Sequence, residues 1–155
     1  MSRDSRDDLV AALGQAVRTN QASVDAFDEA TAVRFGVNRT DLRCLDLLVN
    51  ELDGEATPGQ LGARLGLTTG SVTAMVDRLA KLGYVTRSPD PTDRRKVVVR
   101  PTDTILAKSQ EIYGPIVAAS TELLAKYSDE ELELLIDFQR RARAMQEEHL
   151  KRLRD

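Results

Sequence analysis

Side chains that build reactive centres and covalent cross-links are scarce in this sequence. Among its 155 residues there is one cysteine, one histidine and no tryptophan. The single cysteine, Cys44, cannot form a disulfide within the chain, which favours a reducing cytoplasm. One thiol and one imidazole leave few ways to build a metal site or a Cys–His nucleophile pair. We therefore expect neither a metal site nor a cofactor.

Several sequence signatures are also missing. None of GxGxxG, GxxxxGK[ST], HExxH or GxSxG occurs, so no catalytic residues stand out and we do not expect an enzyme. No apolar run approaches the roughly 18 residues that a membrane span needs, and residues 1–10 contain no apolar signal-peptide core. The hydrophobic content of 41% and the charged content of 30% are typical of a soluble, single-domain globular protein. We therefore do not expect it to bind a membrane.

Charge is plentiful but unevenly distributed. The whole chain carries a net charge of -3, yet residues 60–100 contain eight basic and three acidic side chains. This local excess of five positive charges leaves an excess of eight negative charges on the rest of the chain. A basic region on an acidic body still creates a positive field at its own surface. The acidic average therefore does not exclude a polyanionic partner.

Start and stop signals predict a pair of short helices over residues 57–83. TPGQ at 57–60 is typical of a capping box with proline at the first helical position, and Gly66 ends that helix. The next helix begins at Thr68, with apolar residues on one face and small polar residues on the other. Two helices joined by a tight turn are the sequence form of a helix-turn-helix. An earlier helix is predicted after Asn38, with its apolar residues at Leu42, Leu45, Val49 and Leu52.

Two short β-prone segments follow, YVTRS and KVVVR, on either side of a proline-containing bend. They predict an antiparallel hairpin with Arg94, Arg95 and Lys96 at or near its tip. A helix-turn-helix followed by such a basic ribbon is a winged helix. The three adjacent cations are either a solvated loop or a surface for an anionic partner. Because prolines and a hairpin stiffen the tip and lower the entropy cost of docking, we favour the second interpretation.

The predicted fold class is mainly α, a winged helix-turn-helix with one two-stranded β-hairpin. Residues 1–155 are expected to form one domain, with the winged helix-turn-helix at 38–101 and long dimerisation helices at 5–35 and 102–154. A winged-helix core cannot cover the apolar residues along those helices, and exposing them costs roughly 25 cal/mol per Å². We therefore expect a two-fold homodimer. Its predicted interface residues are Leu13, Val17, Val24, Leu132, Leu135, Phe138, Ala142 and Met145.

Residues 67–102, LTTGSVTAMVDRLAKLGYVTRSPDPTDRRKVVVRPT, resemble the MarR (multiple antibiotic resistance regulator) family of bacterial transcription factors. The resemblance covers nearly the whole chain in order, and it is most specific over the recognition helix, the leucine–glycine turn into the first strand and the DxR of the wing. It departs at residues 101–102, where Pro-Thr stands in place of the family's usual leucine–threonine pair. The resemblance implies a homodimer on pseudo-palindromic double-stranded operator DNA, usually a repressor. In many members a small, often aromatic or phenolic, ligand releases the DNA.

The resemblance and the helix pattern together predict the DNA-binding residues. Hydroxyls and small side chains of the recognition helix are expected in or near the major groove. Arg95 is expected in the minor groove, oriented by Asp93, with its neighbours on phosphates. Polar residues of an isolated helix usually face water, and the adjacent wing is what favours DNA here. The full set is Thr68, Thr69, Ser71, Thr73, Ala74, Arg78, Asp93, Arg94, Arg95 and Lys96.

A small apolar or aromatic effector is predicted on the family resemblance. Its candidate contacts would also suit an ordinary core, and the aromatic content of 4% offers little for a stacking cage. Cys44 is interpreted as a packed side chain and not as an oxidant sensor. The candidate effector contacts are Val24, Phe27, Leu45, Ile112 and Ile116.

Two other functions remain open from sequence. A winged helix can bind protein through the same surface, and the chain could also regulate transcription without any ligand. Salt separates the protein-binding alternative from the DNA-binding one, because a protein that neutralises phosphates loses affinity steeply as salt rises.

Overall fold

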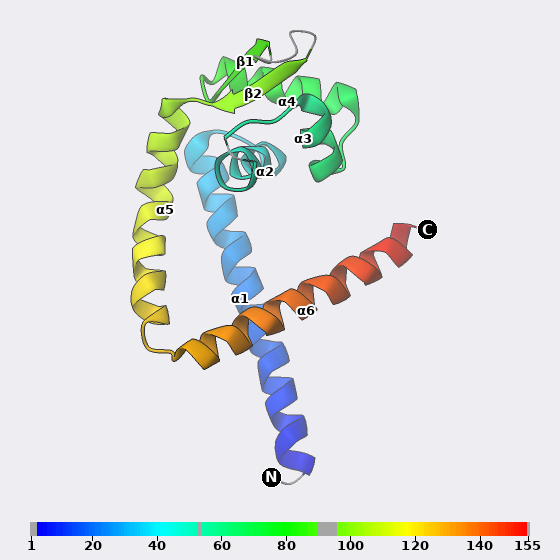
Figure 1. Ribbon diagram of the computed structural model, residues 1–155, viewed down its shortest axis with the longest axis vertical. Helices are drawn as coiled ribbons and strands as arrows, with labels where there is room; N and C mark the ends of the chain where they lie inside the picture. Colours follow the sequence, from blue (N-terminus) through cyan, green and yellow to red (C-terminus); the bar gives the residue numbers. More distant parts are fainter. Residues whose placement is uncertain (1–2, 53, 90–95, 155) are drawn as a thin grey trace. The chain divides into compact units, whose positions relative to one another are not determined.

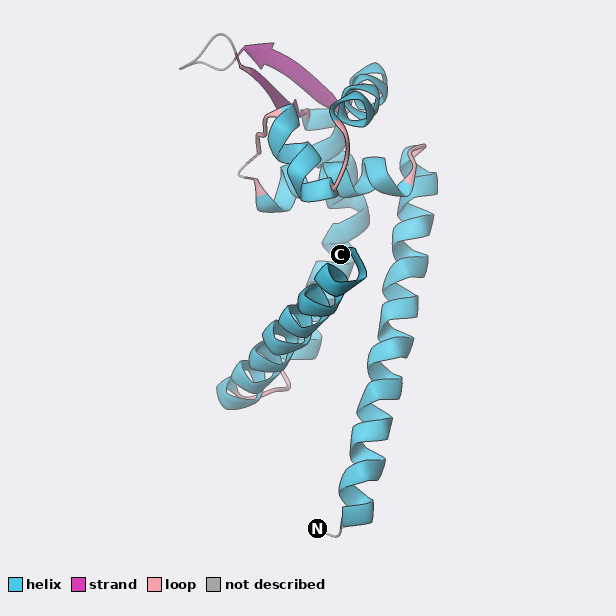
Figure 2. Cartoon of the chain, turned by 90° about the vertical axis from the view of Figure 1, so that its right-hand side faces the viewer, coloured by secondary structure: helices cyan, strands magenta, loops and turns pink. Residues whose placement is uncertain are grey.

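The chain is mainly helical with one two-stranded hairpin, as expected (Figures 1 and 2). This computed structural model describes residues 3–52, 54–89 and 96–154. No helix in these ranges is both long and apolar enough to cross a membrane. Two compact units are present, Met1–Ser109 and Gln110–Asp155. The elements are α1 (Arg3–Phe35), α2 (Arg39–Asp46), the π-helix η1 (Leu47–Glu51), α3 (Pro58–Leu65), α4 (Thr69–Lys81), β1 (Val85–Pro89), β2 (Val97–Pro101), α5 (Asp103–Leu124) and α6 (Asp129–Arg154).

Helix α3 begins and ends at the predicted signals. The Thr57 backbone N–H donates to Gln60 Oε1 at 2.8 Å, and the Gln60 N–H donates to Thr57 Oγ1 at 3.3 Å. These reciprocal bonds satisfy amide donors that the first helical turn leaves without partners. Gly66 follows the helix with φ +67°, a left-handed conformation that glycine adopts without a steric penalty. The capping box and the glycine stop are both confirmed.

The helix after Asn38 differs from the prediction, because it does not stay α-helical to its end. After α2 the chain forms a π-turn in η1, where the Leu52 N–H donates to Leu47 O at 3.0 Å. Leu48 is fully buried, whereas Val49, expected on the buried face, is only half-buried. Of the four residues expected on the apolar face, Leu42 and Leu45 are buried, and Val49 and Leu52 are half-buried.

The core of the unit Met1–Ser109 lies where α2, η1, α3, α4 and the hairpin meet the C-terminal end of α1. The apolar face of α4 is buried as predicted at Val72, Met75, Val76 and Leu79, while Leu82, just past the helix, is 44% exposed. The largest fully buried side chains are Leu48, Leu61, Met75, Leu79, Ile105, Val72, Val76, Val99 and Cys44.

The hairpin β1–β2 is attached to the helices through both of its strands. The strands pair antiparallel, with Val85 opposite Pro101 at the base. On the β2 side, the Ala56 N–H donates to Val99 O at 3.0 Å and the Val99 N–H donates to Ala56 O at 2.8 Å. On the β1 side, a short turn connects the hairpin directly to α4, beside which it lies in Figure 1. This arrangement places the base of the predicted wing next to the second helix of the helix-turn-helix.

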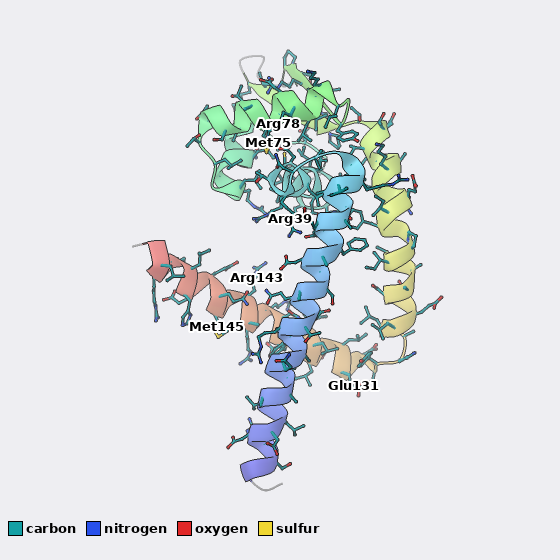
Figure 3. All side chains as sticks on the ribbon, turned by 180° about the vertical axis from the view of Figure 1, so that it is seen from behind. Arg39, Met75, Arg78, Glu131, Arg143 and Met145 are labelled. Atoms are coloured by element: carbon teal, nitrogen blue, oxygen red, sulfur yellow. The ribbon has the colours of Figure 1, made fainter. Side chains whose placement is uncertain are left out.

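Apolar side chains along α1 and α6 remain exposed in the single chain. Among the predicted interface residues, Leu13 and Val24 on α1 and Met145 on α6 are each at least half exposed, and Figure 3 shows Met145 on its helix. Val17 and Leu135 are also exposed, whereas Leu132, Phe138 and Ala142 are half-buried. Such surface is costly to leave in water. The homodimer stays a prediction, and these faces are the apolar surface that it would cover.

Candidate nucleic-acid interface

The N-terminal half of α4 presents small hydroxyl side chains to solvent. Thr68 caps the helix by accepting from the Ser71 N–H at 3.3 Å, and its hydroxyl lies 2.9 Å from Ser71 Oγ. Thr73 Oγ1 donates to Thr69 O at 3.0 Å. Because its one hydroxyl hydrogen is used in this bond, the Thr73 hydroxyl can only accept a hydrogen bond from a partner. A side chain added at Gly70 would meet open space. This face therefore allows a partner's surface to approach the helix backbone closely.

Arg78, in the C-terminal half of the same helix, is held by a buried carboxylate. Its Nε and Nη2 donate to Asp41 Oδ2 and Oδ1 at 3.2 and 2.7 Å. Asp41 is only 2% exposed, whereas half of the Arg78 side chain, labelled on α4 in Figure 3, is exposed according to its accessible surface. The hydrogen bond that Arg78 donates to Asp41, together with the negative charge of Asp41, raises the pKa of the Arg78 guanidinium. The pair joins α4 to α2 and fixes where the guanidinium points.

Asp41 is absent from the residues predicted above. In the sequence it is one acidic residue in the first turn of a helix, where its backbone N–H donates to the Asn38 side chain at 2.9 Å. Because negative charge is favourable in the first turn of any helix, Asp41 needs no further role to explain its presence there. Nothing local indicates a partner in α4.

Folding also changes the charge of the predicted basic surface. Among its described residues, 60–89 and 96–100, four arginines form ion pairs, three of them with carboxylates that lie outside residues 60–100 in sequence. When those three carboxylates are added, the excess of five positive charges falls to two. The positive field is therefore weaker than the sequence count indicates, and the placement of individual cations becomes more important. The four pairs are Arg64–Glu51, Arg78–Asp41, Arg87–Asp77 and Arg100–Glu55.

The predicted wing tip is only partly within the described structure. Asp93, Arg94 and Arg95 lie outside the described residues, so their roles stay predictions. Lys96 immediately precedes β2 and is exposed. It lines a surface cavity of about 660 Å³ together with the start of α3.

A second cavity, of about 630 Å³, lies between α4 and the turn from α1 to α2. Arg39 and Arg78 both line it (Figure 3). Arg39 is itself bound to α1, because its Nη1 donates to Asp25 O at 2.7 Å and its Nη2 lies 3.5 Å from Asp28 Oδ2. Both arginines of this cavity thus already hold carboxylates of the chain.

The predicted effector contacts do not line these two cavities. Leu45 is buried, Phe27 is half-buried and Val24 is exposed. The other two, Ile112 and Ile116, belong to the unit Gln110–Asp155. Their convergence with the first three stays a prediction. Among residues 3–52, 54–89 and 96–154, no group of three or more His, Cys, Asp or Glu side chains is placed to hold a metal ion.

Cys44 of α2 is a fully buried thiol. Burial, and secondarily the negative charge of Asp41, raise its pKa from 9.0 to about 12. A thiol with this pKa is protonated at neutral pH, and the protonated form is a poor nucleophile. The interpretation of Cys44 as a packed side chain agrees with its burial.

Cys44 should therefore react with a disulfide reagent such as dithionitrobenzoate only after the protein unfolds. Because folding raises the pKa of the thiol, its contribution to stability is complete below about pH 9 and is lost as the pH rises towards about 12. The free energy of unfolding of the wild type should thus fall more over this pH range than that of Cys44→Ala.

Wild-type protein and Cys44→Ser should also bind DNA equally well after peroxide treatment. Release of DNA by the wild type alone would contradict the packing role.

Comparison with known proteins adds sequence and fold relationships. The sequence profile of the MarR family matches residues 35–96. The chain is 40% identical over 153 residues to the uncharacterized HTH-type transcriptional regulator YcgE of Bacillus subtilis (strain 168). The aligned region covers 99% of this chain and 98% of YcgE. It is 26% identical over 101 residues to the HTH-type transcriptional repressor YetL of the same organism, over 65% of this chain and 60% of YetL. The structure of reduced AbfR bound to DNA has the same fold, with a TM-score of 0.58 at 20% identity over 99% of this chain and 100% of AbfR.

Proposed function

This chain belongs to the MarR family of winged-helix transcriptional regulators, and we propose that it is a cytoplasmic repressor that binds pseudo-palindromic operator DNA as a homodimer. Family membership also confirms that it is a DNA-binding regulator and not an enzyme. The observation that carries the proposal is the exposed hydroxyl face of α4 beside the base of a basic hairpin, within one compact unit. The family relative YetL, a repressor by name, supports the direction of regulation.

Helix α4 is proposed to lie in the major groove. The Thr73 hydroxyl, left as an acceptor, suits an amino group on a base edge. Asp41 occupies Nε and Nη2 of Arg78, which leaves Nη1 for a phosphate or a base. Thr68 takes up the Ser71 N–H, and the amide groups before it at the start of the helix favour an approaching phosphate. The helix contributes the proposed contacts Thr68, Thr69, Ser71, Thr73, Ala74 and Arg78, and the wing contributes Asp93, Arg94, Arg95 and Lys96.

The homodimer and the effector complete the proposal. Exposed apolar faces on α1 and α6 support association of two chains. A small apolar or aromatic effector is proposed to contact Val24, Phe27, Leu45, Ile112 and Ile116. Binding there would release the operator if the liganded dimer favours a separation of its two α4 helices that does not match the half-sites.

Selection of bound fragments from genomic DNA tests this function. The purified chain should enrich an inverted repeat whose half-sites are centred about 10 base pairs apart. The logarithm of the affinity should fall linearly with the logarithm of the salt concentration, by about 0.9 for each phosphate contact. Light scattering of the free protein should give twice the chain mass of 17.1 kDa.

Each part of the proposal has its own contradicting result. A free mass near 17.1 kDa at micromolar concentration would contradict the homodimer. Failure to enrich any repeat, with binding that is insensitive to salt, would favour the protein-interaction alternative. Transcription that rises when the regulator binds the enriched site would contradict repression while leaving DNA binding intact.

A further inference from the structure

Arg87 of β1 cross-links the hairpin to α4. Its Nη2 donates to the backbone carbonyl of Thr73 at 3.1 Å, and its Nη1 lies 2.7 Å from Asp77 Oδ1. Thr73 and Asp77 are four residues apart and therefore lie one above the other on the same side of the helix. The two arms of one guanidinium thus contact successive turns of α4. Such a planar fork restrains orientation as well as distance.

The cross-link lies some way from the covalent connection between the hairpin and the helix. Gly83, with φ +73°, turns the chain out of α4, and Tyr84 begins the path into β1. Arg87 lies three residues beyond Tyr84, which is about 10 Å along an extended strand. The backbone bridge between Val99 and Ala56, with Val99 opposite Arg87 in the hairpin, already holds the β2 side, and Arg87 adds an attachment of the β1 side to α4 itself. Arg87 therefore restrains, from the β1 side, the direction in which β1 leaves α4.

The other strand is attached to a different part of the unit. Val99 of β2 forms its backbone bridge with Ala56, and Arg100 Nε donates to Glu55 Oε2 at 2.8 Å. These contacts hold β2 to the segment before α3 and do not involve α4. The contact that Arg87 makes directly with α4 is thus on the β1 side of the hairpin.

We propose that Arg87 is a positioning residue that sets the distance along DNA between the bases contacted by α4 and the flank contacted by the wing. This inference rests on the proposed function, because it needs both elements to contact one operator. Asp77 has a supporting role, since it holds one arm of the guanidinium and compensates its charge. The competing role is a direct phosphate contact by Arg87, whose side chain is 35% exposed.

Duplexes that differ only in one spacing separate the two roles. Each would carry the same half-sites, with an A·T tract moved outward by zero, one or two base pairs, each step being about 3.4 Å. Wild type should prefer one spacing by about tenfold. Arg87→Gln and Asp77→Asn should both reduce that preference to about twofold. Arg87→Lys keeps the charge but not the planar fork, and it should behave like Arg87→Gln in spacing preference while keeping the wild-type salt slope.

Asp77→Asn distinguishes the roles most directly. It leaves the Arg87 cation in place and removes the carboxylate that compensates it. If Arg87 acted as a phosphate contact, Asp77→Asn would strengthen binding to all spacings alike, and Arg87→Gln would lower the salt slope by about 0.9. The matched control is Arg64→Gln, which breaks the ion pair between α3 and Glu51 and should leave the spacing preference unchanged.

The outcomes distinguish this inference from the proposed function. A wild type with a spacing preference that both variants retain overturns the positioning role and leaves operator binding intact. A wild type that binds the operator without any spacing preference overturns the wing contact and the inference together. Loss of preference in Arg87→Gln and Asp77→Asn, but not in Arg64→Gln, supports the inference. Circular dichroism of each variant verifies that the winged helix is folded.

Discussion

Replacing Arg94, Arg95 and Lys96 together by alanine should weaken operator binding about 10²- to 10³-fold at low salt. The expected loss combines a minor-groove arginine with two phosphate contacts. Because each lost phosphate contact also ends the release of a counterion, the slope of log affinity against log salt should fall by about two. Binding isotherms at several salt concentrations measure both quantities.

Single substitutions divide this effect among the three cations. Arg95→Ala should cost about 1–3 kcal/mol, mainly on operators with A·T-rich flanks, where a narrow minor groove attracts arginine. Lys96→Ala should weaken binding to all sequences alike and lower the salt slope by about one contact. These different patterns follow from the two grooves and the backbone that the side chains are predicted to contact.

A triple change elsewhere controls for the loss of net charge. Arg141, Arg143 and Lys151 lie exposed on α6, outside the winged helix, and their replacement by alanine removes the same formal charge. This control should bind DNA nearly as wild type does, provided that light scattering gives an unchanged mass. If the triple alanine variant of residues 94–96 also binds as wild type does, the bend is a solvated loop and the wing assignment is wrong.

Arg78→Ala should lower the free energy of unfolding by about 2–3 kcal/mol, a large effect for a half-exposed side chain. The change leaves the Asp41 carboxylate, 2% exposed, without its cation. An uncompensated buried charge costs more than the loss of a favourable contact. Asp41→Ala should cost less, about 1–2 kcal/mol, because the Arg78 guanidinium can turn towards water.

A double-mutant cycle isolates the pair. The variant with both Asp41 and Arg78 replaced by alanine should be about as stable as Asp41→Ala alone, with a coupling energy of about 2–3 kcal/mol in urea unfolding. The exposed pair Asp137–Arg141 on α6 is the matched control, and its coupling should stay below about 0.5 kcal/mol. Equal coupling energies for the two pairs would show that burial of Asp41 does not strengthen its contact with Arg78.

The winged helix could be predicted because its signals act over short distances along the chain. The capping box of Thr57 and Gln60, the left-handed Gly66 and the apolar face of α4 each depend on residues within a few positions. A backbone amide at a helix start needs a partner whatever the rest of the chain does. These local requirements also place the hydroxyl face of α4 and the hairpin next to each other in sequence. The MarR resemblance of residues 67–102 follows from the same local pattern.

The partners of the arginines could not be predicted in this way. Arg78 and Asp41 are 37 residues apart, and Arg87 meets Thr73 across the junction of strand and helix. An arginine in a basic segment gives no sign of which carboxylate folding will bring to it. Counting charges by sequence position therefore overestimated the positive field of this surface.

The sequence pattern contained no sign of the π-turn in η1, where Leu48 is fully buried and Val49 is half-buried. Packing against neighbouring elements decides such a turn, because burying a leucine stabilises the fold by more than one irregular helical turn costs. The pKa of Cys44 likewise depends on the helices that enclose it. The order of residues was sufficient to predict the fold class and to choose the residues that are proposed to face DNA. The orientation of each cation, and the charge left for a partner, depend on long-range contacts that form only when the chain folds.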